Sequence, residues 1–196
     1  MKKRLFVLFM SVLMALAMIG CGKKEDKTEE AKNGASSPEE IVKLVNEDLP
    51  GIAAERDKAV EIYNGYFADG ADIDSETWRA QLEDEALVSY DAYLEKLAAL
   101  TYTNSDVQNL KDLFEKSAKS QRDAIQYVVD SINAVDSTKL ADAQQAIEDS
   151  RTYLGMYQDE LKRLCESYGI TIKGEFQETS TLTDASASDA SSTDGE

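Results

Sequence analysis

The chain has 196 residues and a formal net charge of −17, with no histidine, 10 glycines and 2 prolines. So acidic a chain lacks the clustered lysine and arginine that nucleic-acid binding needs, and without histidine it lacks the commonest general base and zinc ligand. The few glycines and prolines favour long helices over turn-rich β structure. Because the sequence has no Cys-x-x-Cys pair and no phosphate-loop motif, we expect neither an enzyme nor a cofactor or metal site.

The start of the chain has the three parts of a secretory signal. Basic residues at positions 2–4 precede an apolar run over 5–19, which ends at Gly20 and Cys21. The run is shorter than the ~20 apolar residues of a membrane-spanning helix, and charged residues follow it. We therefore predict a signal peptide over residues 1–20.

The end of this run, Met18-Ile19-Gly20-Cys21, resembles the lipobox of bacterial lipoproteins, with Met18 in place of the usual leucine. The resemblance implies that Cys21 carries a lipid with fatty acids such as palmitate and that the chain is cut before it. It also implies an extracytoplasmic protein anchored to the bacterial cell membrane or outer membrane. It covers only the export segment, and an ordinary signal with an incidental cysteine is the alternative.

A tether and a first helix follow. Residues 21–36 mix lysines with acids and have no apolar periodicity, which predicts a disordered tether behind the lipid. Ser37 and Glu40 have the spacing of a capping box at a helix start. The apolar stripe beyond them alternates spacings of three and four and keeps its phase through Pro50-Gly51. This pattern predicts a first helix that is kinked there.

Three more amphipathic stripes follow, over 78–100, 107–135 and 140–168, separated by short polar segments with capping residues. Helices of about thirty residues are ~45 Å long, and short connections make neighbours antiparallel. We therefore predict an all-α domain over 37–173, an antiparallel up-down-up-down four-helix bundle of long helices. A three-helix arrangement with a detached first helix is the alternative. The Ser/Thr/Asp-rich residues 174–196 predict a disordered acidic tail.

Three polar residues, Arg56, Gln121 and Ser150, occupy stripe positions where apolar residues are expected. All three fall near the middle of their helices, so we expect one polar layer inside the bundle. A buried guanidinium needs an acidic partner, and we expect an acid such as Asp149 or Glu85 to reach it. The layer either fixes the register of the helices or forms an anion-binding pocket for a ligand.

Two other patterns combine a structural explanation with a functional alternative. Asp72, Asp74, Glu76 and Glu83 match positions of a calcium-loop register. The register lacks its glycine and runs into a helix start, so we expect helix capping rather than a metal site. Cys165 lies on the last apolar stripe, and we expect a buried, inert thiol rather than a reactive one.

The aromatic residues Tyr63, Tyr66 and Trp78 lie on either side of the first connection, so we expect them at one end of the domain. They either close the core or, together with Phe67, present a surface to a partner. The whole pattern predicts a lipoprotein, attached to the membrane through its acyl anchor, whose acidic helical domain binds a protein or an envelope component. The alternative is a small-ligand sensor or carrier with a polar pocket inside the bundle.

Overall fold

The structure of the protein, a computed structural model, describes residues 19–20, 37–68 and 72–172. This part of the chain is almost entirely helical, which confirms the predicted all-α class. Most of the predicted signal peptide, Cys21 with the tether, and the acidic tail lie outside the described residues. Within the described residues, every helix is too short or too polar to cross a bilayer.

The first helical segment has four parts: α1 (Ser37–Lys43), the π-helix η1 (Leu44–Asp48), α2 (Leu49–Gly51) and α3 (Ala53–Gly65). Between α2 and α3, Ile52 has φ −112° and ψ 2°, outside the α-helical region. Pro50 lies two residues before it and has no backbone N–H to donate. The helical hydrogen bonding is therefore interrupted at the place where the sequence places proline and glycine.

The second segment comprises α4 (Ser75–Gln81), the π-helix η2 (Leu82–Ala86) and α5 (Leu87–Ala99), and it is followed by the two long helices α6 (Ser105–Ala134) and α7 (Thr138–Tyr168). The side chain of Asn104 accepts hydrogen bonds from two backbone N–H groups of the first turn of α6, at 2.8 and 3.2 Å. Two short strands, β1 (Ile19–Gly20) and β2 (Thr171–Ile172), pair antiparallel.

The π-helices follow from the spacing of the buried residues. Around η2 the buried residues are spaced by four: Trp78, Leu82, Ala86 and Tyr90. In an α-helix these three steps would rotate the last residue about 120° away from the first. A π turn bonds residue i to i+5 and so contains one more residue, which recovers about 100°. The same spacing surrounds η1, in Ile41, Val45, Leu49 and Ala53. Each π-helix therefore keeps its apolar residues on the core side.

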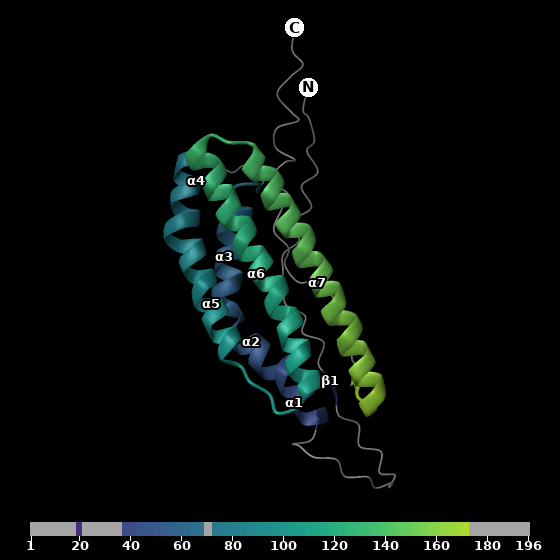
Figure 1. The fold of residues 1–196 in the computed structure, drawn as a ribbon. Coiled ribbons are helices and arrows are strands. Elements are labelled where there is room, and N and C mark those ends of the chain that lie inside the picture. Colours follow the sequence, from purple (N-terminus) through teal and green to yellow (C-terminus); the bar gives the residue numbers. More distant parts are fainter. Residues whose placement is uncertain (1–18, 21–36, 69–71, 173–196) are drawn as a thin grey trace, which may run out of the picture.

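The helices lie alongside one another, and α6 and α7 are in contact along much of their length (Figure 1). The rings of Phe114 and Tyr157 are 5.1 Å apart between centroids, and the hydroxyls of Ser117 and Ser150 are 3.0 Å apart. Along this contact, a later residue of α6 meets an earlier residue of α7. On the other side, α3 packs on α5, and α5 packs on α6.

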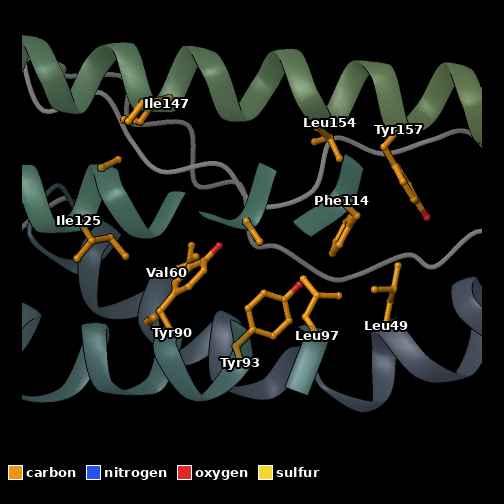
Figure 2. Packing of buried hydrophobic residues seen from close by; sticks show 14 of the residues in the cluster. Leu49, Val60, Tyr90, Tyr93, Leu97, Phe114, Ile125, Ile147, Leu154 and Tyr157 are labelled. Carbon is orange, nitrogen blue, oxygen red and sulfur yellow. The ribbon is translucent and has the colours of Figure 1, made fainter. Parts of the chain in front are cut away.

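The core lies between these helices. Figure 2 shows Ile147, Leu154 and Tyr157 of α7 on one side of it and Tyr90 and Tyr93 of α5 on the other. The start of α1, the α5–α6 loop and the end of α7 lie at one end of the molecule, which we call the α1 end (Figure 1). The α6–α7 turn lies at the opposite end, which we call the turn end.

Glu40 binds a distant loop. Its carboxylate accepts hydrogen bonds from the Thr103 N–H at 3.1 Å, the Thr103 hydroxyl at 2.6 Å and the Asn104 N–H at 2.9 Å. Next to it, the Tyr102 hydroxyl donates to the Asp48 carboxylate at 2.6 Å. The sequence predicted Glu40 only as part of a capping box with Ser37. Its binding to the α5–α6 loop was not predicted, because these partners lie more than sixty residues away from Glu40 in sequence. Together these bonds fasten the first helical segment to the α5–α6 loop.

Candidate functional site

The structure places the three predicted polar residues inside the domain, on three different helices. Arg56 on α3 is 3% exposed, Gln121 on α6 is 5% exposed and Ser150 on α7 is 2% exposed. Each of them bonds to a different partner, and these partners decide what the interior can do chemically.

The partner of Arg56 is its own neighbour in sequence. The Arg56 Nε and Nη2 atoms donate to Oδ1 of Asp57 at 3.2 and 2.8 Å. The expected acidic partner is therefore present, but it is Asp57 rather than Asp149 or Glu85, which bond to Gln145 and Lys58. Consecutive helical residues do not normally face each other, but here the half-exposed side chain of Asp57 meets the buried side chain of Arg56.

Two buried tyrosines connect Arg56 to Gln121. Burial raises the pKa of Tyr93 to about 12, although the nearby Arg56 lowers it again in part. Burial would by itself lower the pKa of Arg56, but Tyr93 and Asp57 hold it raised, so the guanidinium stays charged. The neutral Tyr90 hydroxyl donates to Oε1 of Gln121 at 2.7 Å. Because Tyr90 also lies within electrostatic reach of Arg56, it links the two residues.

Ser150 has a partner that sequence reasoning did not single out. The Ser117 hydroxyl of α6 donates to the backbone carbonyl of Ser150 at 3.0 Å and lies 3.0 Å from its hydroxyl. Ser117 lies beside the apolar stripe of its helix. Its small polar side chain was therefore the only sign in the sequence that it could bond to Ser150. Among the described residues, every buried polar side-chain atom has a hydrogen-bond partner. The interior network is therefore satisfied by the protein itself.

With this geometry in view, the chain can be compared with known proteins. No known family model, curated protein or solved structure matches it.

The aromatic residues expected to share one end do so. The Tyr66 and Trp78 rings stack at 4.2 Å with an interplanar angle of 13°, and Tyr63 lies 5.7 Å from Trp78. Trp78 is 4% exposed, and its indole N–H donates to the backbone carbonyl of Ile62 at 3.3 Å. This cluster closes the core, and only Tyr66 and Phe67 are partly exposed.

The acids of the calcium-like register have structural roles. Asp74 accepts hydrogen bonds from the Thr77 backbone N–H and from the Thr77 hydroxyl, both at 2.8 Å. Glu76 and Glu83 pair with the guanidinium of Arg79. The predicted helix cap is therefore confirmed for Asp74, and the two later acids, Glu76 and Glu83, form ion pairs with Arg79 in the first turns of the helix.

Cys165 is almost fully buried, and burial raises the pKa of its thiol to about 11. A thiol with so high a pKa is protonated at neutral pH, and the thiolate is the reactive form. The predicted burial of this thiol is confirmed, and its inertness stays a prediction.

The outer face of the α6–α7 pair carries a surface pocket of about 550 Å³. Its apolar part consists of Leu113, which is partly buried, and Met156, which is 49% exposed. The Arg163 guanidinium donates to both carboxylate oxygens of Glu160, at 2.8 and 2.6 Å. The pocket is lined by Asn109, Asp112, Leu113, Lys116, Met156, Asp159, Glu160 and Arg163. We call it the α6–α7 pocket. It offers space for an apolar side chain with charged groups around it.

Proposed function

We propose that the protein is a lipoprotein held outside the cytoplasm, in the bacterial cell membrane or the outer membrane, by an acylated Cys21. Its acidic helical domain is a binding module for a protein or an envelope component, without catalytic activity. The observation that carries the anchor is the sequence of residues 18–21 at the end of the apolar run. Because the domain is acidic, an anionic bilayer would repel it, and attachment falls to the acyl chains.

The alternative is a small-ligand sensor or carrier, and it has less support. Such a protein needs polar groups inside the domain that await a ligand. The polar side chains of Arg56 and Gln121 are bonded to Asp57 and Tyr90. A binding role is therefore better placed on the outer surface, where the α6–α7 pocket lies.

The proposed architecture is an antiparallel up-down-up-down four-helix bundle whose first helix is kinked near Pro50-Gly51. It is supported by side-chain bonds between successive segments: Ser89 to Glu55, Arg122 to Asp91, and Ser117 to Ser150. Spin labels at positions 75 and 138, at the starts of α4 and α7, should lie close together. A label at position 105 should lie about a helix length, ~45 Å, from both. Three similar distances would refute this topology.

The anchor is tested by replacing Cys21 with serine and feeding cells a fatty-acid analogue that can be labelled. The variant should lose the label and accumulate as uncut precursor, because serine offers no thiol to alkylate. Cys165→Ser is the matched control, and it should keep both the label and the membrane location. Equal labelling of Cys21→Ser and the unmodified protein would overturn the proposal.

A further inference from the structure

The α6–α7 pocket contains an exposed apolar side chain. The exposed large apolar residues among the described part of the chain are Val88, Val135, Met156 and Tyr168. Of these four, Met156 lines the pocket, where Leu113 provides a second apolar surface. Methionine is flexible and polarizable, so it adapts to different apolar partners.

The charges around this apolar floor are mostly negative. Asp112, Asp159 and Glu160 line the pocket together with the two cations Lys116 and Arg163. Both cations have partners within the domain. Arg163 is bound by Glu160, and the Lys116 ammonium lies 5.8 Å from the centroid of a tyrosine ring on α7. Asp112 in turn binds Lys111, at 3.1 Å, and Gln108, at 2.9 Å. The pocket therefore presents an apolar floor beside the exposed acid Asp159, in a chain of net charge −17.

We propose that the α6–α7 pocket docks a cationic segment of a partner protein. The segment packs one apolar side chain against Leu113 and Met156 and places lysine or arginine against Asp159. This deepens the proposed function and rests on it. A second copy of the chain fits poorly, because each copy carries a net charge of −17 and the two copies would repel each other.

The position of the pocket agrees with a partner in the same membrane. Its residues come from the first half of α6 and the second half of α7, which lie toward the α1 end. The chain enters the domain at that end, through α1 (Figure 1). If Cys21 anchors the protein, the chain from the anchor reaches the domain at the same end as the pocket, which favours a membrane-bound partner.

Three synthetic helical peptides of equal length test the chemistry against the full-length protein in detergent. The first peptide has one face of lysine and one face of leucine. The second replaces every lysine of the first by glutamate, and the third replaces every leucine of the first by serine. Binding is measured by fluorescence anisotropy at several salt concentrations. The lysine–leucine peptide should bind, and the other two should bind at least tenfold more weakly. Equal binding of the glutamate–leucine peptide, or no binding of the lysine–leucine peptide, would overturn the proposal.

Matched variants test the location. Met156→Ser and Asp159→Lys should each weaken binding of the lysine–leucine peptide roughly tenfold, about 1.4 kcal/mol. Val88→Ser and Asp84→Lys make the same chemical changes on the exposed surface of η2 and α5 and should leave binding unchanged. All four sites are exposed, so folding should survive, and melting curves check this. Equal losses in the control variants would mean a diffuse charge effect and would overturn the proposal.

Photo-crosslinking in intact cells distinguishes docking at the α6–α7 pocket from the broader proposal that the domain is a binding module. A crosslinker at position 156 should capture a membrane protein, and the crosslinked segment of that protein should be basic. Capture at position 135, at the turn end, with nothing captured at position 156 would overturn the pocket and leave the binding module standing. Specific capture at neither position in anchored protein would count against both.

Discussion

Replacing Val135 by glycine should stabilise the domain, although it removes an apolar side chain. Val135 follows the last residue of α6 with φ 52° and ψ 42°, in the left-handed region, and it is 93% exposed. This conformation costs an L-residue about 1–2 kcal/mol, and β-branched residues rarely adopt it. Because the side chain is in water, its removal loses almost no buried area.

The chain contains its own reference for this substitution. α6 and α7 end in the same hydrogen-bonding motif, in which the residue after the left-handed position bonds back to a carbonyl five residues earlier. That bond is 3.1 Å long in α6 and 2.8 Å in α7. In α7 the left-handed position, with φ 66°, is occupied by Gly169. The two helix ends thus differ mainly in whether valine or glycine takes the strained backbone conformation.

The expected gain in stability is the relieved backbone strain minus the free-energy cost of the larger unfolded-state entropy of glycine. That cost is about 0.5–1 kcal/mol. The net stabilisation by Val135→Gly is therefore about 0.5–1 kcal/mol, which raises the melting temperature by ~1–4 °C. Gly169→Val should have the opposite effect, since a Cβ there meets no atom within 4 Å and the cost comes from the backbone alone. Val88→Gly within α5 is the control, and it should destabilise.

Urea and thermal unfolding of these three variants measure the effects. The two sites are at opposite ends of α7, so the double variant of Val135→Gly and Gly169→Val should be close to neutral. A lower melting temperature for Val135→Gly, or no loss for Gly169→Val, would refute the reasoning from backbone conformation.

Three further outcomes are expected. Gln121→Leu should lower the free energy of unfolding, measured in urea, by about 1–3 kcal/mol, because the buried Tyr90 hydroxyl loses its acceptor. Tyr90→Phe in the same chain should recover part of this loss. No recovery would contradict the reasoning. Burial raises the pKa of Glu40, but the hydrogen bonds from Thr103 and Asn104 outweigh this and hold the pKa below its ordinary value. The stability that comes from this lowered pKa is present above the ordinary pKa of glutamate and is lost as the pH falls through the folded-state pKa. Glu40→Gln should therefore make the free energy of unfolding depend less on pH in the acid range. An unchanged dependence on pH would contradict this. Thiol reagents should modify Cys165 only as fast as the domain opens, so rapid labelling of the native protein would contradict its burial.

Helix ends were predictable because their signals are local. Asp74 accepts a backbone hydrogen bond at the start of α4, as predicted. Asn104 does the same at the start of α6, in one of the polar segments where capping residues were expected. Gly169 ends α7 in the left-handed conformation that glycine tolerates best. The π-helices also had a local signal in the repeated spacing of four, which is wider than an α-helix turn.

Specific partners were not predictable, because they depend on how segments far apart in sequence meet. The pairing of Tyr90 with Gln121 bridges 31 residues, and that of Ser117 with Ser150 bridges 33. Periodicity places such residues on an inner face but does not say which side chain lies opposite. The α6–α7 pocket was not predicted for the same reason, since its residues lie on the outer, polar faces of two helices.

The bonds between the first helical segment and the α5–α6 loop have a mechanical consequence. A pull on the chain ahead of Ser37 enters the domain through α1, at the end where Glu40 and Asp48 bind the loop. The load would reach these side-chain bonds before the apolar contacts deeper in the core. Since α7 also ends at the α1 end (Figure 1), a force between the two chain ends would peel the outermost turns apart rather than shear whole helices past one another.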